Sequence, residues 1–555
     1  MKTARLAVAT ALCLLVAAGA LPAAAQIAPD GTRGGILRLV SGAGGGTLDP
    51  HINYTTQYFQ LNYILYDGLV TFRKADGKAG EEVVADLAER LPVISDGGRT
   101  LTFVLRDGVK FSNGKPVTVE DVAASLRRMF IVQSPTAGTF FTEIVGADKC
   151  MAQPQTCTLE GGVSVDAASR TVVIRLTAPD YEFLQKLSLP HAAILPADAP
   201  PKDAGAVPIP GTGPYMVVSH DPQKGLDLVR NPYFKEFSAD AQPDGWVDEI
   251  IYDFGLTEEQ QIAAVGAGKA DWMFDTLPSE RLPELAIKYA RRLHVRPLPA
   301  MWYAAMNTNL PPFDDIRVRQ AVNYAIDRYA LVKLAGGPNL AVAACQILPP
   351  EFPGYQPYCP YTLNPGTKWS KPDLRKALSL VEASGTAGMK VAIVVKDAPT
   401  NRAIGENLAG TLRRLGYDAS VKPVPKNIQS VYIQNTDNKV QMSVSMWSQD
   451  YPSASDFLKI LFSCGSFHRS SGASINISGF CDHAIDARMA EALRLGANDP
   501  VQSAALWSEI DKAITDKAPV AVLFNPKEIS FFSSRVRHFE FNDQMFWILS
   551  KSWLE

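Results

Sequence analysis

Hydrophobic and polar positions follow two different periods along this chain. Residues 101–105 alternate apolar and polar side chains, as a strand with one buried face does. After the capping sequence at 118–121, apolar residues recur every three or four positions as far as Phe130, which predicts an amphipathic helix. A predicted strand at 391–395 and a predicted helix at 402–415 repeat this order. Strands that alternate with helices predict an α/β fold.

The N-terminal 25 residues have the pattern of a secretory signal peptide. Basic residues come first, 6–20 is apolar, and the small residues at 23–25 form a cleavage site. The apolar run is shorter than the roughly 20 residues that a membrane-spanning helix needs. Cys13 lies inside it without the residues typical of a lipoprotein signal. We therefore expect a secreted, soluble protein without a lipid anchor.

Six cysteines remain after the predicted signal peptide, as three pairs of near neighbours. An even number in an oxidising compartment predicts disulfides, and we favour pairing between neighbours, which is one of several possible connectivities. The spacings are not those of a metal site and no histidine cluster accompanies them, so we expect no metal and no cofactor. The favoured pairs are Cys150 with Cys157, Cys345 with Cys359, and Cys464 with Cys481.

Charge and motif content narrow the classes of function. A net charge of −3 gives no field that favours nucleic acid or an anionic membrane. The chain has no Gly-x-Ser-x-Gly nucleophile elbow, no His-Glu-x-x-His metal motif and no phosphate-binding loop. We therefore expect a binding protein and not an enzyme.

Five motifs occur in order along most of the chain. They are 35–50 with 65–69, 103–114 (FVLRDGVKFSNG), 211–215 (GTGPY) with 230–233, 307–327, and 447–452 (WSQDYP). Together they resemble the family 5 extracellular solute-binding proteins, which include the dipeptide and oligopeptide receptors of ABC importers. The resemblance runs from about Gly34 to the C-terminus.

This resemblance implies a type II periplasmic-binding-protein fold. In such a fold crossing strands join two lobes, and the ligand lies in the cleft between them. An extra subdomain in the N-terminal lobe makes three subdomains. We place the signal peptide at 1–25, the core of lobe I at 26–71, 202–300 and 520–555, the extra subdomain at 72–201, and lobe II at 301–519.

Asp450 is the main candidate for a ligand contact. It lies between Trp447 and Tyr451, just after an apolar segment. A carboxylate flanked by aromatic side chains is partly shielded from water and can bind a primary ammonium group, while the aromatic rings supply apolar walls. In the peptide receptors that the chain resembles, the aspartate at this position binds the α-ammonium of the ligand. The segment 453–455 lacks the second acidic residue and proline that these receptors often carry, so the details of specificity differ.

The resemblance suggests further ligand contacts in both lobes. Lys396 follows a predicted strand, where dipeptide receptors place a basic residue for the ligand carboxylate; a solvated loop lysine is the alternative. Tyr303 lies where family members present an aromatic from a crossing strand. Residues with hydroxyl groups follow the Asp-Pro motif, where the family commonly places hydroxyls in the cleft. These residues are Tyr54, Thr55 and Thr56.

We interpret the chain as the periplasmic receptor of an ABC importer. It would capture a short peptide between its lobes and deliver it to an inner-membrane permease. One alternative is a receptor of the same fold for another solute, such as an opine, an amino sugar, an oligosaccharide, or a nickel or other metal chelate. A secreted hydrolase is a more distant one. We expect a monomer that does not bind nucleic acid.

Overall fold

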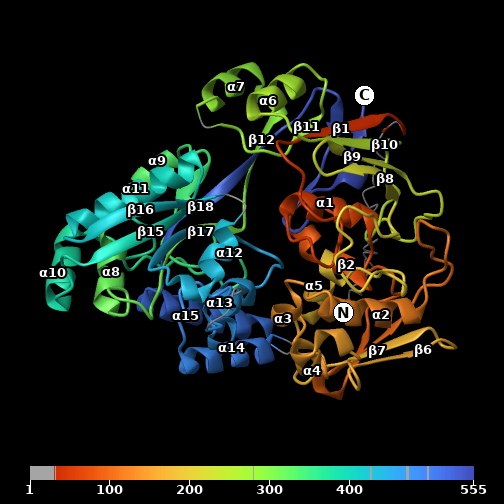
Figure 1. The fold of residues 1–555 in the computed structure, drawn as a ribbon, viewed down its shortest axis with the longest axis horizontal. Helices are drawn as coiled ribbons and strands as arrows, with labels where there is room; N and C mark the ends of the chain where they lie inside the picture. The colour runs from red at the N-terminus through yellow and green to blue at the C-terminus, as the bar shows by residue number, and fades with distance from the viewer. Residues whose placement is uncertain (1–30, 32, 279, 426–427, 470–473, 497–498) are drawn as a thin grey trace, which may run out of the picture.

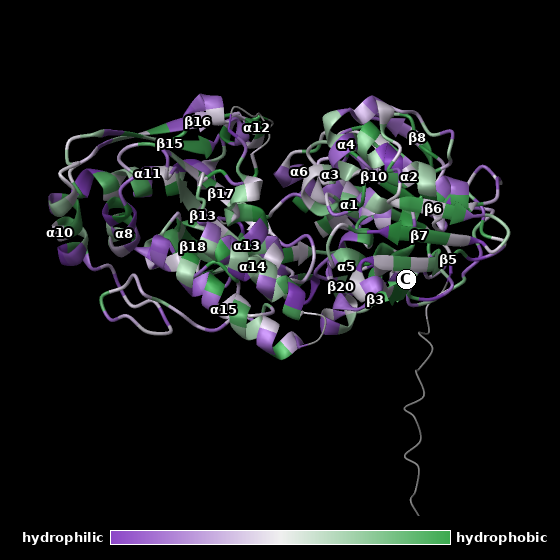
Figure 2. Ribbon diagram, turned by 90° about the horizontal axis from the view of Figure 1, so that it is seen from below, coloured by the Kyte–Doolittle hydropathy of each residue, from purple (hydrophilic) through white to green (hydrophobic). Residues whose placement is uncertain are grey.

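The computed structural model describes residues 31, 33–278, 280–425, 428–469, 474–496 and 499–555. The predicted signal peptide lies outside these residues. Two lobes lie side by side and are joined by long strands that run between them (Figures 1 and 2). We use "lobe I" for the part built on the five-stranded sheet together with the four-stranded sheet, and "lobe II" for the part built on the larger mixed sheet.

The five-stranded sheet of lobe I has the order β11-β1-β10-β9-β8. Strand β1 pairs in parallel with β10 and β11, and the other pairs are antiparallel. The inward side chains of β1, Leu37 and Leu39, are fully buried and share a hydrophobic cluster with helix α1. The elements are β1 (Ile36–Val40), α1 (Thr56–Leu65), β8 (Tyr215–Asp221), β9 (Gly225–Arg230), β10 (Glu249–Asp253), α6 (Glu258–Gly266), β11 (Trp272–Met273) and α7 (Leu282–Lys288).

The extra subdomain of lobe I contains a four-stranded antiparallel sheet of order β4-β5-β7-β6. Leu101 and Phe103 of β5 are buried, as the alternation at 101–105 predicts, and they share a cluster with helix α2. The predicted capping box at the start of α2 is present between Thr118 and Asp121. The elements are β2 (Val70–Phe72), β3 (Val83–Ala85), β4 (Val93–Ser95), β5 (Thr100–Val104), α2 (Val119–Ile131), α3 (Ala137–Phe140), α4 (Ala147–Ala152), β6 (Val163–Asp166), β7 (Thr171–Arg175) and α5 (Phe183–Leu187).

The sheet of lobe II is covered by helices on both faces. Its strand order is β12-β18-β13-β17-β15-β16, and β14 also pairs with β18. Alternate residues of β13 pack against α8, α9, α10 and α11 on one face and against α13, α14 and α15 on the other. The elements are β13 (Ala300–Met306), α8 (Ile316–Ala325), α9 (Arg328–Leu334), β14 (Ala341–Ala343), α10 (Leu374–Ser384), β15 (Lys390–Lys396), α11 (Pro399–Arg414), β16 (Asp418–Val424), α12 (Gln429–Gln434), β17 (Met442–Ser448), α13 (Ala454–Phe462), α14 (His483–Leu495) and α15 (Pro500–Lys517).

Strand β18 (Val520–Phe531) connects the lobes (Figure 1). Its first half pairs with β13 inside the lobe II sheet, and its second half pairs with β12 (Leu293–Pro297). The next residue, Phe532, bridges to Trp272 of the lobe I sheet. We propose that the boundary between the lobes lies within β18, whereas the sequence prediction placed it at residue 520. The chain ends in lobe I with the short strands β19 (Val536–His538), β20 (Phe541–Asn542), β21 (Phe546–Trp547) and β22 (Trp553–Leu554).

The predicted pairing of neighbouring cysteines is confirmed. Disulfides join Cys150 to Cys157, Cys345 to Cys359, and Cys464 to Cys481. Among the residues described, no helix has the length and apolar character needed to cross a bilayer.

Candidate functional site

The segment that carries Asp450 follows directly after β17, an inner strand of the lobe II sheet. The fully buried carboxylate of Asp456, in the first turn of α13, holds this segment in place from the lobe II side. It accepts a hydrogen bond from the backbone N–H of Asp450 at 3.0 Å and one from the indole N–H of Trp447 at 3.4 Å. Lobe II therefore holds Asp450 in a defined position at the end of a strand.

Asp450 meets lobe I through Tyr54. The hydroxyl of Tyr54, just before α1, donates a hydrogen bond to Oδ2 of Asp450 at 2.5 Å, although the two residues are 396 positions apart. Asp450 is half-buried, and 39% of the surface of Tyr54 remains exposed to solvent. Residues from both lobes thus enclose one carboxylate without sealing it from solvent.

The electrostatic surroundings of Asp450 favour a positively charged group of a ligand. Burial raises the pKa of Asp450 to about 7, and the hydrogen bond from Tyr54 offsets part of that rise. Burial and the nearby Asp450 together hold the pKa of Tyr54 well above its ordinary value. Among the described residues no lysine or arginine forms an ion pair with Asp450. An ammonium group would supply the missing positive charge.

The two aromatic residues beside Asp450 have different surroundings. Trp447 is half-buried and packs against clusters of both lobes. Tyr451 is buried within the cluster of the extra subdomain, where its ring meets the edge of Phe140 at a centroid distance of 5.5 Å and Lys186 Nζ lies 5.8 Å from its centroid. Tyr451 therefore anchors the segment to lobe I. The predicted roles of both aromatics as walls around a ligand stay predictions.

Sequence reasoning missed a second contact between the lobes at Glu182. The carboxylate of this buried residue, in the extra subdomain, accepts hydrogen bonds from the hydroxyls of Ser453 and Ser455. The signal available in the sequence was the departure from the family pattern at 453–455. Nothing in the sequence around residue 182 indicated the partner.

Sequence reasoning also missed His191, which supports Tyr54 in lobe I. The rings of these residues meet edge-to-face at 4.9 Å, and Phe59 lies 5.3 Å from the imidazole. Burial lowers the pKa of His191 to about 3, so the ring is neutral at physiological pH. A neutral imidazole packs against the phenol of Tyr54 without adding a charge beside Asp450.

The other two candidates of this region lie at the start of α1. Thr55 is the N-cap residue; its hydroxyl accepts from the N–H of Tyr58 and donates to Oδ1 of Asn53 at 2.7 Å. Thr56 is the first residue of the helix and is exposed. Thr55 thus has a structural role in the cap, and contact of either threonine with a ligand stays a prediction.

Tyr303 and Lys396 lie on other strands of lobe II. Tyr303 belongs to a hydrophobic cluster with residues of α13 and α15, and burial raises its pKa to about 12. Lys396 is half-buried at the end of β15, where its backbone is in register with Val424 of β16. The ligand-binding roles of both residues stay predictions.

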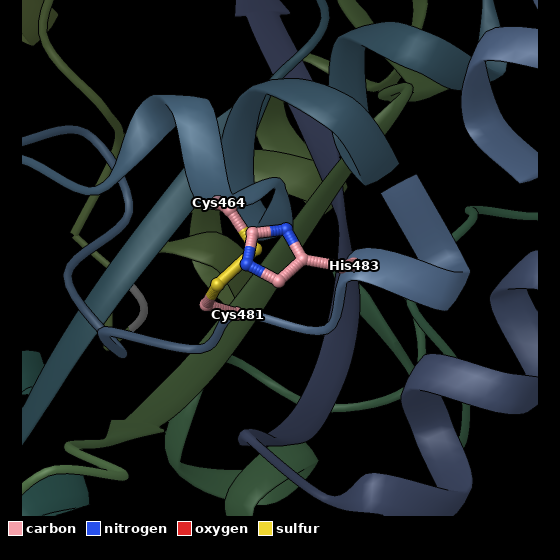
Figure 3. Close-up of side chains that lie close together, drawn as sticks. All are labelled: Cys464, Cys481 and His483. Carbon is pink, nitrogen blue, oxygen red and sulfur yellow. A yellow bond between two sulfur atoms is a disulfide. The ribbon is translucent and has the colours of Figure 1, made fainter. Parts of the chain in front are cut away.

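A cluster with possible metal ligands lies elsewhere in lobe II. The ligand atoms of Cys464, Cys481 and His483 lie within 4.8 Å of one another (Figure 3). The two sulfur atoms are bonded to each other as a disulfide, so neither is a thiolate, the form in which cysteine binds zinc. These residues do not fit a metal ion.

Comparison with known proteins gives consistent matches over most of the chain. The model of the bacterial extracellular solute-binding proteins, family 5 (middle) matches residues 82–469. The glutathione-binding protein GsiB of Salmonella typhi is 26% identical over 501 residues, which cover 89% of each chain. GsiB of Escherichia coli strain K12 is 25% identical over 500 residues, with the same coverage.

Solved structures of peptide-binding proteins have the same fold. The clavulanic acid biosynthesis oligopeptide binding protein 2 has a TM-score of 0.84 at 25% identity, and the match covers 94% of this chain and 96% of that one. The periplasmic binding protein DppA from Helicobacter pylori, in complex with the peptide STSA, has a TM-score of 0.77 at 21% identity and covers 94% and 99%. The predicted fold, two lobes with crossing strands and an extra subdomain, is confirmed. This chain belongs to the bacterial extracellular solute-binding proteins of family 5.

Proposed function

We propose that this protein is a periplasmic receptor that captures a short peptide between its lobes and delivers it to the permease of an ABC importer. The observation that carries the proposal is the carboxylate of Asp450, which lies between the lobes, bonds to Tyr54 and has no described cation beside it. A free α-ammonium would form a charge-assisted hydrogen bond there. We propose Asp450 and Tyr54 as the pair that binds the amino end of the peptide.

The relatives support a ligand of this class. The curated relatives at 25–26% identity are named glutathione-binding proteins, and one structure of the same fold holds the peptide STSA. Glutathione and simple peptides share a free α-amino group and a carboxylate at the opposite end. A receptor with the carboxylate of Asp450 between its lobes suits the amino end of such molecules.

Closure of the two lobes is the mechanism that we propose for capture. Strands β12 and β18 connect the lobes, so a change in their backbone angles would rotate one lobe against the other. A ligand that contacts both lobes favours the closed state, because only that state makes both sets of contacts. The closed receptor would then present a different surface to the permease.

The test is a binding panel with the purified mature protein. Calorimetry and thermal shift would compare tri-alanine, reduced glutathione, the N-acetylated form of each, an oligosaccharide and a nickel chelate. The proposal predicts that the free-amino peptides bind and stabilise the protein by mass action, and that the acetylated forms bind far more weakly. Binding of the oligosaccharide or the chelate with no response to any peptide would instead support a receptor for another solute.

A further inference from the structure

The contact between Glu182 and lobe II has a role beyond packing. We propose that Glu182 is a positioning residue that holds the Asp450 segment in the closed receptor, by accepting hydrogen bonds from Ser453 and Ser455 across the two lobes. This inference rests on the proposed function for the part that concerns retention of a ligand, whereas the contact between the lobes can be tested without one. It assigns to the extra subdomain a part in retaining the ligand.

The side chains of Glu182 and Ser453 do not cap their own helices. Glu182 is the N-cap residue of α5, yet its side chain does not cap that helix. Ser453 is the N-cap residue of α13, and serine at such a position normally accepts a backbone N–H of the helix; here its side chain does not. Ser453 thus lacks the usual cap bond and instead donates to Glu182 across the lobes. This hydrogen bond can form only where the two lobes are in contact.

A chain of hydrogen bonds leads from Glu182 through Ser455 to Tyr451. The hydroxyl of Ser455 donates to Glu182, so the 3.0 Å contact between Ser455 Oγ and the Tyr451 hydroxyl has tyrosine as its donor. Tyr451 adjoins Asp450 in the chain and packs in the cluster of the extra subdomain. Glu182 thereby holds the residues that follow Asp450 in the chain.

Neighbouring residues of the extra subdomain support the backbone of Glu182. The backbone N–H of Glu182 donates to Asp180 at 3.0 Å, and Asp180 forms a buried ion pair with Lys186 at 2.6 Å. Burial raises the pKa of Glu182, and the positive charge of Lys186 counteracts that rise. Lys186 also lies over the ring of Tyr451. The backbone of Glu182 is thus fixed beside a buried cation of its own subdomain, which suits a contact that must re-form at each closure.

The experiment is a double-mutant cycle on the rate at which tri-alanine leaves the protein. The variants are Glu182→Ala, the pair Ser453→Ala with Ser455→Ala, and all three changes together, with Glu89→Ala as the matched control. Glu89 is an exposed carboxylate of the same subdomain that pairs with Arg170 of that subdomain. Stopped-flow fluorescence of the tryptophans would give the association and dissociation rate constants.

We expect Glu182→Ala to raise the dissociation rate constant about tenfold to a hundredfold, the scale for hydrogen bonds to a charged acceptor. The association rate constant should change little, because the contact forms after the ligand enters. The serine changes should add little in the absence of Glu182, and Glu89→Ala should behave as the parent protein. Additive effects of the two sets of changes would overturn the proposal.

A second measurement needs no ligand and separates this proposal from the proposed function. Hydrogen exchange of residues 450–462 in the unliganded protein should be faster in the Glu182 variant and in the serine variant than in the parent. If tri-alanine fails to bind the parent protein, the proposed function fails, and the exchange experiment still decides the role of Glu182. Equal exchange in all variants would overturn that role.

Discussion

Replacing Asp450 by asparagine tests the proposed ligand contact. The change keeps the shape of the side chain and removes its negative charge. We expect a large effect on a ligand with a free amino group, because Asp450 is the carboxylate that Tyr54 contacts and, among the described residues, no lysine or arginine forms an ion pair with it. An exposed aspartate at the start of β16, Asp418, offers the matched control Asp418→Asn.

The magnitude follows from the surroundings of the carboxylate. Removing one partner of a buried, hydrogen-bonded charge pair costs about 2–5 kcal/mol. Asp450 is half-buried, and the hydroxyl of Tyr54 remains to meet the ammonium group, so the lower part of this range applies. We expect a loss of about 2–3 kcal/mol, which is about 30- to 150-fold in the dissociation constant.

Calorimetry with tri-alanine and its N-acetylated form gives the assay. In the parent protein, acetylation should weaken binding by about the same factor as Asp450→Asn, because each change removes one partner of the same contact. In the Asp450→Asn variant, acetylation of the peptide should weaken binding only slightly further. Equal penalties for acetylation in the parent and the variant would refute the contact between Asp450 and the ammonium group.

Three further predictions concern closure and stability. Tyr54→Phe removes the hydrogen bond to Asp450 and should cost about 1 kcal/mol of affinity, measured by the same calorimetry; unchanged affinity would show that the hydroxyl has no part in binding. Burial raises the pKa of Asp450 to about 7 where the two lobes meet, and separation of the lobes would return this carboxyl group to water and lower its pKa. Lowering the pH should therefore raise the ratio of closed to open unliganded protein by up to about tenfold per pH unit below neutrality. In small-angle scattering, Asp450→Asn should remove this pH dependence. A dependence that persists in the variant would exclude Asp450 as its source. Replacing Cys464 and Cys481 by serine opens a disulfide that spans 17 positions and should lower the free energy of unfolding by about 3 kcal/mol in guanidinium titrations, whereas an unchanged midpoint would mean that the bond contributes nothing.

Local patterns in the sequence were sufficient to predict individual elements. The predicted strand at 391–395 lies within β15, and the alternation at 101–105 corresponds to β5. Helix α11 begins at Pro399, three residues before the predicted start, because proline is favourable in the first turn of a helix. These features depend on contacts between residues that are close in the sequence, so the local pattern of residue types is enough to predict them.

The contacts between the lobes could not be predicted in this way. Tyr54 and Asp450 were each candidates, but their hydrogen bond joins residues 396 positions apart and forms only when the lobes meet. Glu182 was not a candidate, since its partners Ser453 and Ser455 are 271 and 273 positions away. Such pairs depend on how the two lobes meet, and the local periodicity and spacing of residues carry no information about that.

The most direct test of the central claim is small-angle X-ray scattering of the mature protein with and without a free-amino peptide. We expect reduced glutathione or tri-alanine to make the parent protein more compact, and the Asp450→Asn variant to show this change only at much higher peptide concentration. A scattering profile that stays the same at saturating concentrations of every peptide tested would contradict capture of a peptide by closure of the two lobes.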